Sequence, residues 1–268
     1  MRVSNSQVIN VAHVSVIRRG RATLDDVSFV AHEGEHWAVI GPNGAGKSTL
    51  MALCAAVTYA SRGVVSILGQ RVGTVDRSEL TKHIGYVTTH HLLEWPMTAT
   101  DVLLTAFTNT VETPMRWTAT RQQSAVARQQ LEKFGLVDVA ETNWRALSQG
   151  ELGRLFLARA SLLTPRILLL DEPASGLDLA AREQVLDVID ELVAANPTLT
   201  SVSITHHVEE LPSSTSHVAL MAHAKILFQG PISETLTSEN ISTTFGLPIR
   251  VVHDDGRWST RSERSSRY

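Results

Sequence analysis

The stretch GPNGAGKST at residues 41–49 restricts the possible folds of this chain more than any other. A glycine is followed, after four residues, by Gly46, Lys47 and Ser48, which is the spacing of a phosphate-binding loop. Glycines allow backbone N–H groups to point inward around an anion, and the first turn of a helix adds about half a positive charge. We therefore expect a buried strand at residues 37–40, then this loop, and then a helix at residues 50–57.

The whole loop is expected to hold the phosphates of a nucleotide. Lys47 is long enough to reach the terminal phosphates, and the hydroxyl of Ser48 is a suitable ligand for Mg²⁺. A glycine-rich turn with a chance lysine is the alternative, but such a turn would not need a strand before it and a helix after it. The predicted nucleotide-binding residues are Gly41, Pro42, Asn43, Gly44, Ala45, Gly46, Lys47, Ser48 and Thr49.

Two carboxylates further along the chain complete the predicted site. Residues 167–170 are Ile-Leu-Leu-Leu, an apolar run typical of a strand that is buried on both faces. Asp171 and Glu172 follow directly, and ligands collect at the carboxyl edge of parallel sheets. We expect Asp171 to hold Mg²⁺, directly or through water, and Glu172 to act as a general base or to position the attacking water.

The composition limits the classes of protein to which this chain can belong. Its 268 residues are 43% hydrophobic, which is enough for one large α/β domain with a subdomain, and its net charge of −3 argues against a nucleic-acid partner. Cys54 is the only cysteine, so we expect no intrachain disulfide and a packing role for its thiol. The longest apolar run, residues 50–57, is far shorter than the roughly 20 residues of a membrane span. Because residues 1–6 also lack an apolar signal segment, we expect a cytoplasmic protein.

The order of the predicted elements indicates a core that is interrupted by helices. We expect strands at residues 7–17, 24–30, 63–68, 84–87, 200–204, 217–221 and 225–228, and a helix at residues 180–195. From about residue 88 to residue 145 the pattern is helical, most clearly at residues 99–107 and 121–134, which indicates an inserted subdomain. The polar residues 254–268 include four arginines, and we expect a frayed end there, with a membrane-surface or nucleic-acid role as the alternative.

Three short motifs accompany the loop and the acids in a fixed order. Residues 147–151, Leu-Ser-Gln-Gly-Glu, resemble the signature motif Leu-Ser-Gly-Gly-Gln of the ABC transporter family. Residues 175–178, Ser-Gly-Leu-Asp, match the D-loop of that family, and Thr205-His206 matches its switch-histidine motif. Each motif alone is a weak signal, but the ordered set covers nearly the whole chain. The chain therefore resembles the ATP-binding subunit of an ABC transporter.

This resemblance implies an α/β fold with several parts. The expected architecture is a P-loop NTPase core with a mostly parallel sheet, an antiparallel β subdomain and an inserted α-helical subdomain. Residues 1–87 and 146–230 would form the core with the antiparallel β subdomain. Residues 88–145 would form the helical insertion, and residues 231–268 a C-terminal extension with a polar tail.

The resemblance also implies an enzyme that hydrolyses Mg-ATP to ADP and phosphate. Two copies would close head to tail on two ATP molecules, with Asp178 in the D-loop and His206 contacting the γ-phosphate as a catalytic residue. Hydrolysis would power solute transport through a separate integral membrane permease, and a solute-binding protein is a further candidate partner. The subunit would be cytoplasmic, on the inner face of the cell membrane. The signature residues that would contact the partner's ATP are Ser148, Gln149, Gly150 and Glu151.

Two positions outside the signature motif depart from the family pattern. No aromatic residue is present where the family usually stacks one on adenine, and Arg18 either stacks its guanidinium there or remains a solvated charge in a turn. Thr89 stands where the family usually has a Gln that senses Mg²⁺ and contacts the membrane partner, so the implied metal ligands are Ser48, Asp171 and Thr89. A subset of the family with iron-chelate and molybdate systems accepts Ser or Thr at this position, and residues 34–37 also resemble that subset.

The missing Gln keeps an alternative function open, namely a soluble ABC-type ATPase that acts as a mechanical switch on a ribosome or a nucleic-acid complex. Against this alternative, the chain has neither two ATPase halves nor a long coiled-coil insertion. A nucleotide-binding module without turnover is a further alternative, against which Glu172 and His206 argue. Residues 90–91 and 206–207 are pairs of histidines that invite a transition-metal site, but adjacent side chains point in different directions.

Overall fold

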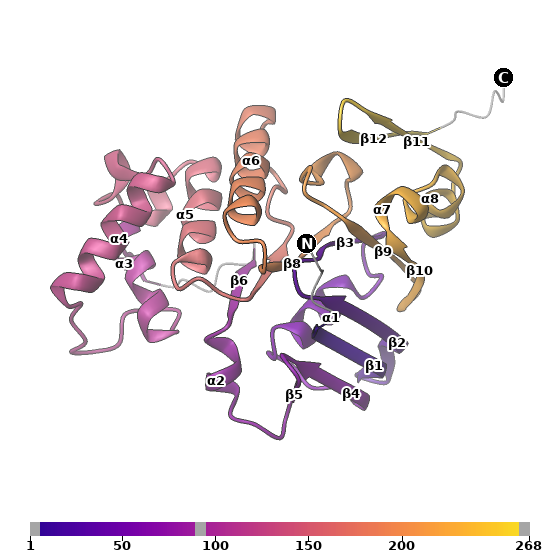
Figure 1. The fold of residues 1–268 in the computed structure, drawn as a ribbon, viewed down its shortest axis with the longest axis horizontal. Helices are drawn as coiled ribbons and strands as arrows, with labels where there is room; N and C mark the ends of the chain where they lie inside the picture. The colour runs from indigo at the N-terminus through magenta and orange to yellow at the C-terminus, as the bar shows by residue number, and fades with distance from the viewer. Residues whose placement is uncertain (1–5, 89–94, 263–268) are drawn as a thin grey trace.

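The computed structural model describes residues 6–88 and 95–262, and a six-stranded sheet lies at its centre (Figure 1). The strands have the order β10-β9-β3-β8-β7-β6. Neighbouring strands from β9 to β6 are parallel, and β10 joins the edge antiparallel to β9. These strands are β3 (His36–Ile40), β6 (Ile84–Thr88), β7 (Ile167–Asp171), β8 (Thr200–Thr205), β9 (His217–Ala222) and β10 (Lys225–Pro231). The prediction of a mostly parallel sheet is confirmed.

Strand β7 shows why this sheet occupies the centre. All five of its residues are buried. Ile167 and Leu169 pack into the hydrophobic cluster that contains helix α1, whereas Leu168 and Leu170 pack into a second cluster with helices α5 and α6. Because successive residues of a strand point to opposite faces, one unbroken apolar run supplies two cores. The helices are α1 (Lys47–Cys54), α2 (Arg77–Thr81), α3 (Ala99–Leu104), α4 (Arg121–Lys133), α5 (Gln149–Ser161), α6 (Leu179–Ala195), α7 (Ile232–Thr235) and α8 (Ser238–Phe245).

A second sheet of four strands is antiparallel throughout, in the order β2-β1-β4-β5. It contains β1 (Gln7–Arg18), β2 (Arg21–His32), β4 (Arg62–Ile67) and β5 (Gln70–Arg71). The buried residues of these strands join the cluster around α1, so the predicted antiparallel β subdomain is confirmed. Cys54 lies in the same cluster, where burial raises the pKa of its thiol to about 12, which suits the predicted packing role.

Helices α3, α4 and α5 lie together beyond the edge strand β6 (Figure 1). They form the second hydrophobic cluster, together with α6 and the facing side of β7. A capping box begins each of the three helices, at Thr98, Thr120 and Ser148. In each box the side chains of the first residue and of the residue three positions later hydrogen-bond each other's backbone N–H groups. The predicted helical subdomain is confirmed.

The C-terminal region forms a third packed unit. After α7 and α8, strands β11 (Ile249–Asp254) and β12 (Arg257–Ser262) pair as an antiparallel hairpin. Asp255 and Gly256 form its turn with φ angles of 47° and 73°, which suits the tight Asp-Gly turn of a two-residue hairpin. Trp258 packs against a hydrophobic cluster that contains Val208 and Leu211. The expectation of a frayed end is therefore wrong for residues 254–262, because backbone pairing and apolar contacts order this segment.

Other element boundaries also differ from expectation. Helix α1 begins at Lys47 and not at residue 50, because Gly46 in the left-handed conformation turns the loop directly into the helix. The α-helix predicted at residues 99–107 ends at Leu104 and continues as a 3-10 turn. The sequence patterns predict neither α2 nor β5, which are only five and two residues long. Across residues 6–88 and 95–262, no helix has both the length and the apolar character needed to cross a membrane.

Candidate functional site

The loop between β3 and α1 borders an open cavity of about 230 Å³. This cavity lies at the carboxyl edge of the parallel strands, where sheets of this kind bind their ligands. Its lining residues are Thr23, Asn43, Gly44, Ala45, Gly46, Lys47, Ser48, Thr49 and Glu172. The structure therefore brings Glu172 to the loop, although more than 120 residues separate them in the sequence.

Two glycines of the loop leave no room for a side chain. At Gly46, φ is 105°, and a Cβ atom would lie 2.4 Å from the carbonyl oxygen of Thr23. At Gly41, a Cβ atom would lie 2.0 Å from the carbonyl oxygen of Met221 in β9. The loop can thus approach its neighbours closely only because these two residues have no side chain. Glycines also leave backbone N–H groups accessible to a phosphate.

The ammonium group of Lys47 lies within the loop. Its side chain is buried, and Nζ donates to the carbonyl oxygens of Gly41 at 2.7 Å and Pro42 at 3.1 Å. Burial lowers the pKa of Lys47, while the carboxylates of Glu172 and Asp171 act in the opposite direction. A buried cation that donates to carbonyl oxygens attracts an anion that enters the cavity.

The two acids at the end of β7 have different surroundings. Asp171 is buried, with 7% of its surface exposed, and it continues the sheet by pairing with Ile204 of β8. Glu172 leaves the strand with a φ of 53°, and its N–H donates to the carbonyl oxygen of Ile204 at 3.0 Å. A left-handed backbone at a residue with a side chain costs on the order of 1–3 kcal/mol. This strained turn is what directs the Glu172 side chain to the cavity.

His206 comes from the end of the neighbouring strand β8 and meets Glu172. Its Nδ1 lies 3.2 Å from Oε1 of Glu172, and the two side chains are 29% and 27% exposed. A partly solvated imidazole in this position has its other ring nitrogen available for a ligand. His207 is exposed, as predicted, with its ring tilted against that of His206 at a centroid distance of 4.1 Å.

The signature residues lie apart from this cavity, at the beginning of α5. Ser148 caps the helix, and both its N–H and its hydroxyl donate to Oε2 of Glu151, at 2.8 and 2.7 Å. These hydrogen bonds lower the pKa of the Glu151 carboxyl, chiefly through the Ser148 side chain. None of Ser148, Gln149, Gly150 and Glu151 lines the cavity, although all four are among the described residues. Asp178 caps the next helix, α6, where its Oδ1 accepts from the N–H of Ala181 at 2.8 Å.

The remaining predicted residues have varied positions. Arg18 lies at the exposed end of β1, where Nη2 contacts the hydroxyl of Thr58 at 3.4 Å, and it does not line the cavity. Thr89 lies outside the described residues. Thr23 of β2 does line the cavity, and sequence reasoning missed it. It belongs to no motif, and only the folding of β2 against the loop reveals it.

The oxygen atoms at this edge of the sheet suit a magnesium ion. Mg²⁺ prefers hard oxygen ligands and keeps several waters and phosphate oxygens in its shell, so one or two protein ligands suffice. The hydroxyl of Ser48 and the carboxylate of Asp171 are such ligands, and they therefore fit this ion. No group of three or more His, Cys, Asp or Glu side chains in the described part of the chain is arranged for a metal ion, and residues 90–91 lie outside that part.

Comparisons with known proteins point to one family. A profile of the ABC transporter family matches residues 24–175. The uncharacterized ABC transporter ATP-binding protein YlmA of Bacillus subtilis is 31% identical over 263 residues, which cover 96% of this chain and 98% of that protein. The manganese transport system ATP-binding protein MntB of the same organism is 29% identical over 248 residues, covering 92% and 95%.

Solved structures give the same result for the fold. An ATP-binding cassette of an ABC transporter in its ADP conformation has a TM-score of 0.76 at 23% identity, covering 89% of this chain and 98% of that one. A dimeric cassette in a post-hydrolysis state, bound to ADP and Pi, has a TM-score of 0.72 at 23% identity, covering 84% and 98%. The phosphate-binding loop, its neighbouring acids and these matches agree: the chain belongs to the ABC transporter family and is an ATPase that binds ATP.

Proposed function

We propose that this chain is the energy-supplying subunit of a membrane transporter. It binds Mg-ATP between two copies of itself and hydrolyses it to drive a solute through a separate integral membrane permease. The observation that carries this proposal is the contact of 3.2 Å between His206 and Glu172 beside the cavity of the loop. A carboxylate for water and an imidazole for phosphate are both needed for turnover, and a module that only bound nucleotide would need neither.

Each side chain has a distinct part in this reaction. Residues 41–49, including Lys47, bind the phosphates. Ser48 and Asp171 would hold Mg²⁺, which would neutralise charge on the phosphate oxygens. Glu172 orients the attacking water and accepts its proton, because its side chain borders the same cavity as Lys47. His206 stabilises the negative charge that develops on the terminal phosphate. Arg18 is proposed to contact adenine, and Thr89 is proposed to contact the metal ion.

The second copy supplies the part that each cavity lacks. The signature residues lie outside the cavity of their own chain, and the cap at Ser148 provides backbone N–H groups at the positive end of α5. In a head-to-tail pair they face the ATP of the other copy, with Asp178 at the boundary. Leu179, directly after Asp178, is 68% exposed, as expected of an apolar residue in an interface. The dimeric cassette bound to ADP and Pi gives a precedent in a related fold.

The membrane permease is proposed to dock in a groove of about 320 Å³ between α2, β6 and α5. Val57 and Val111 on its border are 48% and 42% exposed, and Phe156 contributes an aromatic wall. Arg159 stiffens the floor, because its Nε and Nη2 donate to Thr105 and to the carbonyl oxygen of Thr110, both at 2.7 Å. An apolar groove with a few polar groups suits an amphipathic helix of the permease.

The solute is proposed to be a metal ion or a metal chelate, which fits the iron-chelate and molybdate subset suggested by the sequence. The relatives include the manganese protein MntB and the hemin import ATP-binding protein HmuV of Thermobifida fusca, which is 27% identical over 252 residues. The transporter would then work as an importer with a solute-binding protein, and this subunit would lie on the inner face of the membrane. We also propose the division into residues 1–87 with 146–230, residues 88–145, and residues 231–268.

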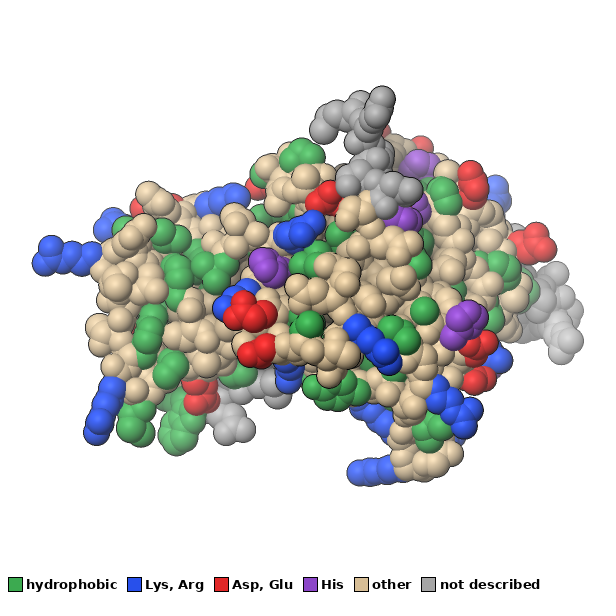
Figure 2. All heavy atoms as spheres, turned by 60° about the horizontal axis from the view of Figure 1, so that its bottom comes forward, with side chains coloured by type: hydrophobic (Ala, Val, Ile, Leu, Met, Phe, Trp, Pro, Cys, Tyr) green, Lys and Arg blue, Asp and Glu red, His purple; other side chains and the backbone are tan. Residues whose placement is uncertain are grey.

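The alternative of a nucleic-acid or ribosome switch gains no support from the face drawn in Figure 2. On the face drawn in Figure 2, the Lys and Arg side chains are dispersed among other residues and form no continuous basic band. A nucleic-acid partner would favour clustered cations that follow the phosphate backbone. The transport proposal is therefore the one that we develop.

The variant Glu172→Gln tests the proposal. It keeps the size of the side chain but removes the carboxylate, so we expect Mg-ATP to bind, phosphate release to fall by at least about 100-fold, and a stable dimer to accumulate. Light scattering with and without Mg-ATP measures the mass. Glu191→Gln, at an exposed glutamate of α6, is the matched control and is expected to stay active. A Glu172→Gln protein that remains monomeric in Mg-ATP would contradict the sandwich mechanism.

A further inference from the structure

We propose that the C-terminal hairpin of β11 and β12 is a clamp that holds His206 in its working position. Glu209 and Thr260 are the positioning residues of this clamp. The inference rests on the proposed roles of His206 and Glu172, and it adds to them a distant segment on which turnover depends.

The first observation is a paired contact between the hairpin and the turn that follows β8. Both the N–H and the hydroxyl of Thr260 donate to Oε1 of Glu209, each at 2.8 Å. Glu209 lies three residues after His206, in the 3-10 turn Val208–Glu210. A carboxylate oxygen that receives two donors from one residue is fixed in direction as well as in distance. The turn after His206 is thus tied to β12.

The other end of the same turn is anchored inside the molecule. The hydroxyl of Thr205 donates to Oε2 of Glu210 at 2.5 Å, and both residues are buried. The N–H of His207 donates to the same hydroxyl at 3.0 Å. His206 therefore lies between an internal anchor at Thr205 and an external anchor at Glu209. Release of the external anchor would leave the turn after His206 held by the Thr205–Glu210 hydrogen bond and by the packing of Val208.

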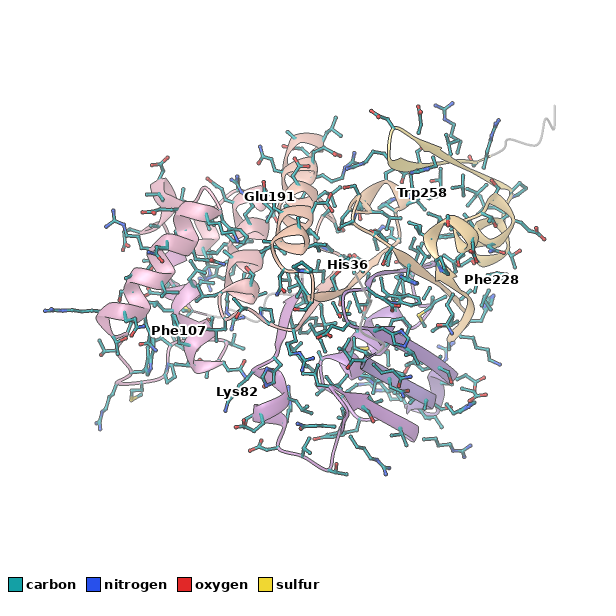
Figure 3. The ribbon with its side chains drawn as sticks, in the orientation of Figure 1. His36, Lys82, Phe107, Glu191, Phe228 and Trp258 are labelled. Carbon is teal, nitrogen blue, oxygen red and sulfur yellow. The ribbon has the colours of Figure 1, made fainter. Side chains whose placement is uncertain are left out.

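Apolar packing supports the external anchor. Trp258 and Thr260 are two residues apart on β12 and share one face of the strand. Trp258 packs against the cluster that contains Val208 of the same turn. Figure 3 labels Trp258 on the hairpin and Phe228 on β10, both of which border this cluster. One face of β12 thus provides both the hydrophobic contact and the hydrogen bonds to the turn.

A second contact joins the hairpin to helix α6. Nη2 of Arg257 lies 2.8 Å from Oε2 of Glu183, which is one turn into the helix that begins after Asp178. Both side chains are more than one third exposed, so this ion pair is weak and readily exchanged for water. Strand β12 therefore contacts two segments that lead directly from proposed site residues.

Thr260→Val is the test, because it removes the hydroxyl but keeps the shape and the backbone N–H. We expect kcat for ATP to fall three- to tenfold while KM stays within twofold, since phosphate binding does not involve the clamp. Glu209→Ala is expected to have a larger effect in the same direction. Thr260→Ser restores the hydroxyl and should recover most of the rate, and Ser262→Ala at the exposed end of β12 should resemble the wild type.

A second measurement does not depend on turnover. The ring signal of His206 in a carbon-13 NMR spectrum, assigned with His206→Ala, should shift or broaden in Thr260→Val and remain unchanged in Ser262→Ala. An unshifted His206 signal overturns the clamp, and so does a wild-type kcat in Thr260→Val. Equal losses in Thr260→Val and Thr260→Ser would assign the effect to packing alone and also overturn it. A wild-type protein without ATPase activity counts against the proposed function instead, and the NMR signal then decides the clamp by itself.

Discussion

At the scale of single residues, Lys47 is the most constrained side chain of the site. Its ammonium is buried and is held by two carbonyl oxygens of its own loop. Burial lowers its pKa because it disfavours the charged form, whereas the carboxylates of Glu172 and Asp171 favour that form. An arriving triphosphate provides the negative charge for which the carbonyl dipoles of the loop are only a partial substitute. The binding of nucleotide should therefore depend strongly on this one cation.

Replacement of Lys47 by Ala tests this dependence. We expect the affinity for Mg-ATP to fall by at least about 100-fold, which corresponds to about 3 kcal/mol, because a charge-assisted contact to phosphate is lost. Isothermal titration calorimetry measures the affinity. Lys82→Ala is a matched control, since Lys82 is exposed and pairs only with Glu79 on the surface. Unchanged affinity in Lys47→Ala would contradict the phosphate role.

Glu151 places a negative charge at the signature, where the family usually has a neutral Gln. Its carboxylate accepts hydrogen bonds from the hydroxyl and the N–H of Ser148. Gln123 fills the same position in the capping box of α4, so an amide can also serve in such a box. We expect Glu151→Gln to keep α5 intact and to strengthen ATP-dependent dimerisation several-fold in the Glu172→Gln background. Sedimentation over a series of ATP concentrations measures this, and weaker dimerisation would exclude charge repulsion at Glu151.

The same carboxylate makes a prediction about pH. Its folded pKa is lower than its ordinary value of 4.5, so its stabilising effect is fully present above that value. The effect is lost as the pH falls through the lowered folded pKa, because the bound proton removes the charge that strengthens these hydrogen bonds. At pH 7, urea denaturation should give the wild type a free energy of unfolding that exceeds that of Glu151→Gln by less than about 1 kcal/mol. The difference should shrink towards pH 3, and a constant difference would refute the link.

Most of the site residues could be predicted from the sequence, for a physical reason. The loop and Asp171 lie at the ends of short apolar strands, and sheet topology gathers such ends at one edge, whereas His206 was predicted from the resemblance to the family. Thr23 could not be predicted, because it reaches the cavity from another sheet through contacts that no local pattern encodes. The strained φ of Glu172 was equally hidden, since a left-handed turn at a glutamate has no sequence signal.

At the scale of elements, apolar patterning predicted long or fully buried segments better than short ones. Strand β7 was evident because four consecutive apolar residues must serve two faces. Helix α2 has one buried residue, Leu80, and so leaves almost no periodic signal. In the hairpin of β11 and β12, Asp255-Gly256 is a typical turn sequence, but the polar composition of this segment favoured the prediction of a frayed end. Its order comes from contacts with distant segments at Val208 and Glu209.

Leu169 provides a test of the shared core at this scale. It is fully buried in β7 and packs on the side of the sheet that faces α1. We expect Leu169→Ala to lower the free energy of unfolding by about 2–5 kcal/mol, because the removed atoms leave a cavity that the sheet cannot close. Leu227→Ala in β10, where 37% of the surface is exposed, should cost less than about 1 kcal/mol. Chemical denaturation compares the two, and equal losses would contradict the assignment of the core.

At the scale of the whole molecule, the proposed contact surfaces lie on different parts. The signature begins α5, the groove proposed for the permease lies between α2, β6 and α5, and the clamp contacts the turn after β8 and helix α6. Helix α5 takes part in two of these surfaces, so it is suited to pass a change of nucleotide state to the membrane partner. Because it is packed along its length in the second hydrophobic cluster, we expect such a change to shift it as a rigid element.

A charge in the groove tests the docking site. We expect Val111→Asp to reduce recovery of the chain with the membrane fraction by at least about fivefold, since a carboxylate cannot be desolvated under an apolar helix. The residue is 42% exposed, so the melting temperature should stay within a few degrees. Val137→Asp, at a residue that is 45% exposed in the helical insertion, is the control. Equal recovery of both variants would place the permease elsewhere.

The position of Thr260 in the chain has a consequence for biosynthesis. The ribosome completes the loop, Asp171 and His206 well before it reaches β12. A growing chain that has already folded its nucleotide pocket would therefore hold ATP with an unsecured imidazole. Under the clamp proposal, newly made protein consumes ATP several-fold more slowly until its hairpin has emerged and closed, which reduces hydrolysis by unfinished chains.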